Sequence, residues 1–127
     1  MTTKHGHFVW NELYTRDPQA AVRFYSETLG WTFDPMPMEN GTTYYVARDG
    51  ADYVAGIFQM AGPEFDGIPE HWFAYIEADD VDNRTAMVAA AGGRIIRAPW
   101  DIPQVGRIAI VQAPTGAFYG LMTSLAA

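Results

Sequence analysis

Residues 8–31 read FVWNELYTRDPQAAVRFYSETLGW, and this stretch decides the fold. Asp17 is a favoured N-cap residue, and Pro18 suits the first helical position, where no backbone N–H is needed. The apolar side chains that follow recur at helical spacing, and Gly30 is typical of a residue that ends a helix. The stretch therefore predicts a strand, a turn, and a helix over residues 18–29.

The same order recurs later in the chain. The apolar segment 72–76 precedes a second cap at Asp80 and a second predicted helix over residues 84–91. Asp17 and Asp80 are 63 positions apart, and the same step separates the glycines that end the two helices. Because both ends of the helix keep this step, the pattern indicates one supersecondary unit used twice.

Three short strands are predicted after each helix, because turn signals and β-rich runs alternate there. In the first half they cover 32–33, with an interruption at 34–38, then 42–48 and 53–60. In the second half they cover 94–96, with an interruption at 98–103, then 107–112 and 117–123.

Each half thus reads β-α-β-β-β, which predicts an α+β protein. We expect a single domain over residues 1–127. Module one covers about 8–60, a linker 61–70, and module two about 71–124.

Composition excludes several classes of function. The chain has 127 residues, no cysteine and a net charge of −7, so it offers neither disulfides nor a thiolate metal site. No basic cluster is present to displace counterions from nucleic acid. The N-terminus has no apolar signal core and no apolar run is long enough to span a membrane, so we expect a cytoplasmic protein without nucleic-acid or membrane partners.

Two motifs resemble the vicinal oxygen chelate superfamily. They are D-x-x-x-A-x-x-F-Y-x-x-x-L-G-W over residues 17–31 and the closing VQAPTGAFYGL over residues 111–121. This superfamily includes glyoxalase I, bleomycin-resistance proteins and extradiol dioxygenases. The resemblance implies two βαβββ modules that form a half-open barrel around a cavity, and commonly a homodimer.

The resemblance also implies a divalent metal held by four side chains, one on the first strand and one on the last strand of each module. Those positions correspond here to Trp10, Phe73, Gly56 and Gly120. None of these side chains can ligate a hard or borderline cation. We therefore expect that the family metal site has been lost and that no cofactor is bound.

An alternative register keeps a metal. A shift of two residues along the strands preserves the face and places Glu12 and His71 at the ligand positions. His71 is then a fallback metal ligand, or otherwise an ordinary histidine at the rim of the cavity.

Glu12 is the candidate catalytic residue. Strand alternation places it on one face with Trp10 and Tyr14. Burial among rings would raise the pKa of its carboxyl group, as an acid or base catalyst requires. The alternative is a structural carboxylate that accepts a hydrogen bond from Arg107 or a tyrosine hydroxyl.

The aromatic side chains on the predicted cavity face favour a ligand pocket, although they could also simply fill the barrel. The candidate ligand-binding residues are Trp10, Tyr14, Phe58, Phe73, Tyr75, Trp100, Arg107 and Phe118. Arg107 could bind an anionic group, or it could form an ion pair with Asp101.

Three functions follow, and the first is preferred. The chain is predicted to resemble a bleomycin-resistance protein that binds a small, partly aromatic molecule in an apolar cavity. The alternative is an enzyme of the superfamily, a lyase, isomerase or dioxygenase, that uses Glu12 as acid or base with or without a divalent metal. A purely structural protein is disfavoured because polar groups point into the expected cavity.

Overall fold

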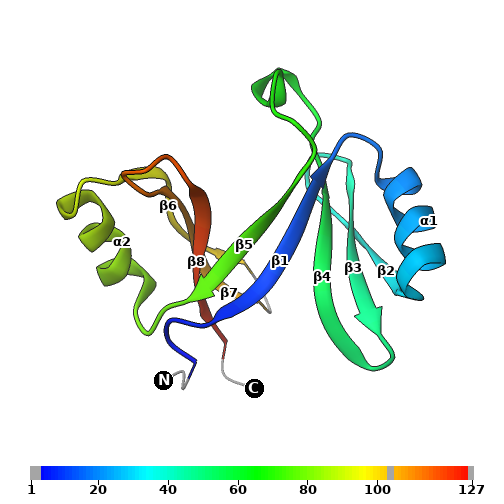
Figure 1. Cartoon of the computed structure of the whole chain (residues 1–127), viewed down its shortest axis with the longest axis horizontal. Coiled ribbons are helices and arrows are strands. Elements are labelled where there is room, and N and C mark those ends of the chain that lie inside the picture. Colours follow the sequence, from blue (N-terminus) through cyan, green and yellow to red (C-terminus); the bar gives the residue numbers. More distant parts are fainter. Residues whose placement is uncertain (1–3, 103–104, 126–127) are drawn as a thin grey trace. The chain divides into compact units, whose positions relative to one another are not determined.

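The computed structural model describes residues 4–102 and 105–125 and divides the chain into two compact units. The first unit is Trp10–Phe73, and the second combines the described residues of 1–9 with those of 74–127. The chain order is β-α-β-β-β, repeated, and in each unit the helix lies to one side of the strands (Figure 1). The predicted α+β fold of two βαβββ modules is thus confirmed.

The first module contains one helix and four strands. They are β1 (Phe8–Thr15), α1 (Pro18–Leu29), β2 (Thr32–Pro37), β3 (Thr43–Asp49) and β4 (Asp52–Gln59). The strand order is β2-β3-β4-β1. β1 runs parallel to β4, and the other neighbours are antiparallel. A short 3-10 helix, Pro63–Phe65, lies in the segment that follows.

The second module repeats this arrangement. Its elements are β5 (His71–Glu77), α2 (Val81–Ala90), β6 (Arg94–Ile102), β7 (Gly106–Gln112) and β8 (Phe118–Ser124). The strand order is β5-β8-β7-β6, and β5 runs parallel to β8. The first and last strands of each module are therefore parallel neighbours.

The predicted helix caps are confirmed. The Asp17 carboxylate accepts a hydrogen bond of 3.1 Å from the backbone N–H of Ala20, and Gly30 ends α1 with a φ of 74°. Asp80 caps α2 in the same way, at 3.1 Å from the N–H of Asn83. Because Asp80 is the N-cap, α2 starts at Val81, three residues before the predicted start.

The predicted interruptions of two strands are wrong within the described residues. β2 continues through Pro35 and Pro37, and β6 continues through Pro99 to Ile102; residue 103 lies outside the described part of the chain. Both are the outermost strands of their modules. A proline is tolerated there because an edge strand can turn the position without an N–H away from its neighbour.

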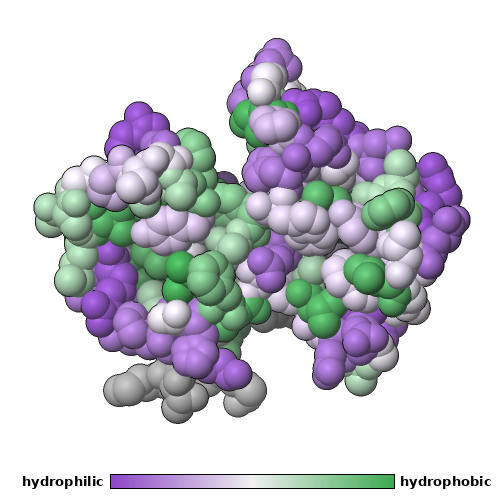
Figure 2. Space-filling model, viewed as in Figure 1, coloured by the Kyte–Doolittle hydropathy of each residue, from purple (hydrophilic) through white to green (hydrophobic). Residues whose placement is uncertain are grey.

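Each unit has an apolar core. Buried side chains of the first unit are Leu13, Ala47, Ala55, Ile57, Met60 and Phe73. In the second unit Val81, Ala109, Val111 and Leu121 pack with Ile76, Val88 and Tyr119. Hydrophobic side chains also reach the surface of both units (Figure 2). In the part of the chain that the structure describes, no helix is long and apolar enough to cross a membrane.

Candidate ligand site

Gly56 lies at the centre of the candidate site in the first unit. It pairs with Glu12 of β1 on one side and with Val46 of β3 on the other. Tyr44 precedes Val46 by two residues and so shares its face of the strand. The Tyr44 hydroxyl fills the space that a Cβ at position 56 would occupy, so any larger residue there would have to displace the Tyr44 side chain.

Three side chains form a hydrogen-bonded row beside Gly56. The Tyr44 hydroxyl donates to Oε2 of Glu12 at 2.7 Å, and the indole Nε1 of Trp10 donates to the Tyr44 oxygen at 3.3 Å. Glu12 is buried, with 9% of its surface exposed. A tyrosine hydroxyl was one of the two expected donors to Glu12, and the structure shows this hydrogen bond.

The electrostatics keep Tyr44 protonated. Burial and the negative charge of the nearby Glu12 raise the pKa of the Tyr44 phenol far above its ordinary value of 10.0. The hydrogen bond that the phenol donates to Glu12 acts in the same direction, since ionisation would remove the donor. The pair is therefore a neutral donor bound to a carboxyl group.

An aromatic cluster continues the row along the same face of the strands. The Tyr14 ring stacks on the His71 ring with centroids 5.0 Å apart, and it lies 4.9 Å from Phe58 and 5.5 Å from Phe73. Phe58 also contacts Phe65, at 5.8 Å between centroids. The His71 ring is anchored because its Nδ1 lies 2.7 Å from the carbonyl oxygen of Pro69.

The residues at the family's metal positions do not fit a metal. Trp10 uses its indole N–H to bind Tyr44, and Phe73 is a buried ring. Gly56 and Gly120 have no side chain, and the space beside Gly120 is filled by the Tyr75 ring just as Tyr44 fills the space beside Gly56. Among the described residues, no group of three or more His, Cys, Asp or Glu side chains is placed to hold a metal.

Glu12 and His71, the two metal ligands of the alternative register, have different partners in the structure. Glu12 accepts its hydrogen bond from Tyr44, whereas His71 stacks on Tyr14 and binds the Pro69 carbonyl.

The remaining predicted ligand residues lie in the second unit. Tyr75 is buried in register with Gly120, and Phe118 at the start of β8 is 54% exposed. The Arg97 guanidinium covers the Trp100 ring at 3.5 Å from its centroid, a contact that strand alternation alone did not predict. The register irregularity of β6 between Arg97 and Trp100 explains this contact, because it breaks the alternation of faces between these two residues.

Arg107 is held by two carboxylates. It binds Asp82 through two hydrogen bonds of 2.9 and 3.0 Å, and it lies 3.2 Å from Asp101. The expected pair with Asp101 is confirmed, and the contact with Asp82 was missed. The hydrogen bonds from Arg107 lower the pKa of the Asp82 carboxyl group below its usual value.

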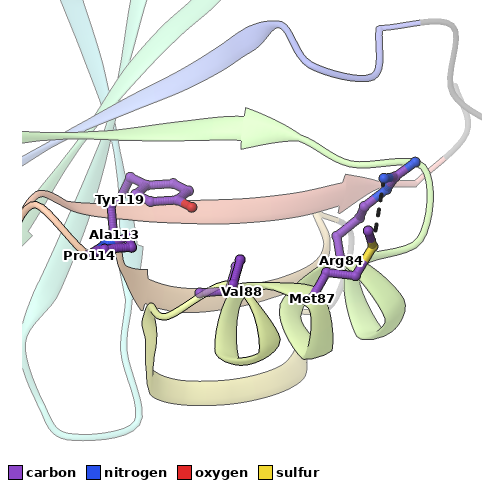
Figure 3. A pocket seen from close by; sticks show the side chains of 7 residues that line it. Arg84, Met87, Val88, Ala113, Pro114 and Tyr119 are labelled. Carbon is purple, nitrogen blue, oxygen red and sulfur yellow. Dashed lines mark hydrogen bonds between the residues drawn. The ribbon is translucent and has the colours of Figure 1, made fainter.

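Two hollows in the structure lie away from these residues. One, of about 250 Å³, lies in the second unit between α2 and the turn that joins β7 to β8 (Figure 3). It is lined by Met87 and Val88 of α2 together with Tyr119 and Pro114, and the Met87 side chain points toward Arg84, which donates to its sulfur at 3.8 Å. The other, of about 300 Å³, lies at the start of α1 and has a polar lining.

Sequence reasoning missed Tyr44, although it named Trp10, Glu12 and Gly56. A glycine inside a strand signals the close approach of another group. Here that group is the side chain of Tyr44 on the neighbouring strand.

Residues 4–118 match the profile of the Glyoxalase/Bleomycin resistance protein/Dioxygenase superfamily. The chain therefore belongs to this family, as the sequence motifs predicted.

Two curated relatives share this sequence pattern. The "Putative glyoxylase CFP32" of Mycobacterium bovis is 38% identical over 122 residues, which is 96% of this chain and 46% of that protein. The "Anthracycline biosynthesis protein DnrV" of Streptomyces peucetius is 29% identical over 123 residues, 88% of this chain and 45% of that protein. The chain thus spans about half the length of these relatives.

Solved structures share the fold at lower identity. A methylmalonyl-CoA epimerase from Mycobacterium tuberculosis superposes with a TM-score of 0.70 at 13% identity, over 99% of this chain and 93% of that one. At this identity the likeness shows the fold alone.

Proposed function

We propose that this chain binds a small, flat, partly aromatic molecule against the face formed by β1, β3 and β4 of the first unit, without a metal. One observation carries the proposal. The Tyr44 hydroxyl, bound to Glu12, occupies the space beside Gly56, where the family resemblance places a metal ligand. The site therefore presents rings and one hydrogen-bonded carboxyl group instead of an open coordination sphere.

The rings suit a flat ligand. Trp10 is partly buried at one end of the row, and Tyr14 and Phe58 continue the same face, so their edges and faces offer a broad apolar contact. Each well-placed ring contact stabilises a complex by roughly 0.5–1.5 kcal/mol beyond the area that it buries. Two or three such contacts with one polar anchor are typical of a small-molecule site.

A relative suggests a test compound. The name of DnrV assigns that protein to anthracycline biosynthesis, and anthracyclines contain a flat, fused-ring chromophore. We therefore choose doxorubicin, an anthracycline with intrinsic fluorescence, as the probe.

Titration of the chain into doxorubicin tests the proposal. We expect saturable quenching, and we expect Trp10→Ala to weaken binding by about tenfold, because one ring contact of about 1.4 kcal/mol is lost. The matched control is Trp72→Ala. The Trp72 ring contacts Tyr25 of α1, at 5.5 Å between centroids, so its removal leaves the proposed face intact. Equal affinity for the wild type and Trp10→Ala would contradict the proposed face.

A second function is favoured by the burial of Glu12 next to a phenol. A carboxylate in such surroundings can remove a proton from carbon next to a carbonyl group. Exchange of carbon-bound protons of methylglyoxal or dihydroxyacetone in D2O, followed by NMR, measures this activity. Catalysed exchange that is lost in Glu12→Gln would support an enzyme, whereas doxorubicin binding without any exchange supports a binding protein.

We also propose that the chain forms a homodimer. The family resemblance supports this proposal, and so does the length of the relatives, of which the chain spans 46% and 45% in the two cases. Sedimentation equilibrium tests it, since a dimer has twice the mass of the 14.1 kDa chain.

A further inference from the structure

We infer that the polar hollow at the start of α1 binds a small neutral molecule with several hydroxyl groups, of the size of one sugar ring. The hollow measures about 300 Å³, and all the residues that line it belong to the first unit. They come from the turn before α1, the first turn of α1, the loop between β2 and β3, and strands β3 and β4. Sites for drug-sized ligands measure roughly 300–1,000 Å³, so this hollow suits a molecule of one ring.

The hollow lies on the opposite face of the strands from the aromatic row of the proposed site. Tyr45 follows Tyr44 along β3, so the two side chains point to opposite faces. Gln59 follows Phe58 along β4 in the same way. The contact of Tyr45 with Gln19 shows that this is the face on which α1 lies. The inference is therefore independent of the proposed function.

The side chains of Gln19 and Tyr45 offer a donor next to an acceptor. Nε2 of Gln19 donates to the Tyr45 oxygen at 2.6 Å, which leaves the phenol O–H to donate and Oε1 of Gln19 to accept. Among the described residues, neither of these two groups has a further partner. A hydrogen bond into the phenol oxygen also strengthens the one that its O–H donates. Since a hydroxyl group both donates and accepts, two neighbouring hydroxyls of one ligand match this pair.

Thr43 and Gln59 extend this pattern in the lining of the hollow. A threonine hydroxyl and a carboxamide each supply both donors and acceptors. In the part of the chain that the structure describes, neither side chain forms a hydrogen bond with another residue. The lining therefore offers donors and acceptors together, which a polyhydroxyl compound can satisfy and an apolar ligand cannot.

The charges in the lining favour a neutral ligand. The Arg16 guanidinium donates to two backbone carbonyl oxygens of the segment after β4, at 2.8 and 2.6 Å. The Asp17 carboxylate accepts from the backbone N–H of Ala20 at 3.1 Å, and Pro18 has no N–H, so the end of the helix itself offers little to an anion. With one residue of each sign, the lining has no net formal charge.

Two-dimensional NMR of the nitrogen-labelled chain tests the inference. The probes are D-glucose, D-galactose, D-mannose and myo-inositol, and cyclohexanol is the control, a ring of similar size with a single hydroxyl. We expect at least one polyol to bind with a Kd on the order of 1–10 mM, the affinity that a few hydrogen bonds provide. We expect it to shift the backbone amides of Thr42, Thr43 and Gln59, which lie at the hollow, and cyclohexanol to leave them in place.

A pair of matched variants tests the donor. Tyr45→Phe keeps the ring and removes the O–H, so polyol binding should weaken by about fivefold. Tyr53→Phe is the control, because Tyr53 lies on β4, is 62% exposed and does not line the hollow; its affinity should equal that of the wild type. If Tyr45→Phe does not fold, the amide shifts of the wild type still locate the site.

The contrary results are distinct from a failure of the proposed function. No shift of these amides with any of the four polyols at about 100 mM, or equal shifts with cyclohexanol, overturns the inference. Equal affinity of the wild type and Tyr45→Phe overturns the role of the donor pair. Preferential binding of glucosamine that is lost in Asp17→Asn overturns the neutral class of ligand. Doxorubicin titration, at the opposite face, decides the proposed function separately.

Discussion

The hydroxyl of Tyr44 occupies the position beside Gly56 that a Cβ would fill. The two residues belong to neighbouring strands, and the contact places the phenol 2.7 Å from Glu12. The glycine and the tyrosine therefore form a matched pair: the absence of a side chain at one position permits the hydrogen bond made by the other.

Gly56→Ala should disrupt this pair. The new methyl group and the Tyr44 hydroxyl cannot occupy the same space, so the ring must move and its hydrogen bond to Glu12 must break. We expect a loss of about 1–3 kcal/mol in the free energy of unfolding, as is typical of overpacking. Urea denaturation measures this loss.

The matched background for that experiment is Tyr44→Ala. In this background the added methyl group meets open space, so Gly56→Ala should cost much less than in the wild type. Additive effects of the two substitutions would show that Tyr44 is not the group that requires glycine at position 56.

Tyr44 should remain protonated at alkaline pH while the protein is folded. Its pKa is raised in the folded state, so the stability it contributes is fully present below its ordinary pKa of 10.0 and is lost as the pH rises above that value. Absorbance of phenolate near 295 nm measures the ionisation. In the native state, the wild type and Tyr44→Phe should show the same number of titrating tyrosines.

In denaturant, the wild type should titrate one more tyrosine than Tyr44→Phe. If the extra phenolate already forms in the native wild type at its ordinary pKa, the described burial of Tyr44 and its bond to Glu12 are wrong.

Acid should remove the contribution of the ion pair between Asp79 and Arg84. Hydrogen bonds of 2.9 and 3.0 Å from Arg84 lower the pKa of Asp79 well below its ordinary value of 3.8. The stabilisation is therefore present above pH 3.8 and is lost as the pH falls below it. We expect Arg84→Gln to lower Tm at neutral pH and to converge with the wild type in acid.

Both partners of this pair are exposed, so we expect a small difference in Tm that salt reduces. Arg23→Gln, on the exposed surface of α1, is the matched control for the loss of one positive charge. A difference in Tm that is independent of pH would contradict the role of the Asp79 carboxylate.

Arg16 should protect the segment between the modules from proteolysis. Its guanidinium donates to the carbonyl oxygens of Ile68 and Phe65 at 2.8 and 2.6 Å, and its backbone N–H donates to Glu70 at 2.8 Å. We expect Arg16→Ala to accelerate cleavage by chymotrypsin after Phe65. Arg23→Ala should leave the rate unchanged, and equal rates in both variants would show that Arg16 does not hold this segment.

The local parts of the fold could be predicted because their signals are local. Asp17, Pro18 and Gly30 define α1 without reference to the rest of the chain, and the repeat carries the same reasoning to the second module. The continuation of β2 through its prolines could not be predicted, since it depends on the strand being at an edge.

The candidate site could be predicted only in part. Alternation along β1 predicts that Trp10 and Glu12 lie on one face. The structure confirms this prediction, since both side chains form a hydrogen bond with the Tyr44 hydroxyl. The partner itself is 32 positions from Glu12, on a strand whose register with β4 is not visible in the sequence. The contact of Arg107 with Asp82 was missed for the same reason, since it joins β7 to the first turn of α2.

Metal content tests the proposed metal-free site most directly, because the Tyr44 hydroxyl fills the space beside Gly56 where the family resemblance implies a metal ligand. The untagged chain is equilibrated with zinc, nickel, manganese and iron, washed, and measured by mass spectrometry of the elements. We expect occupancy near zero for all four metals. About one metal per chain in the wild type, lost in Glu12→Gln, would show that Glu12 holds a metal, contrary to the proposed function.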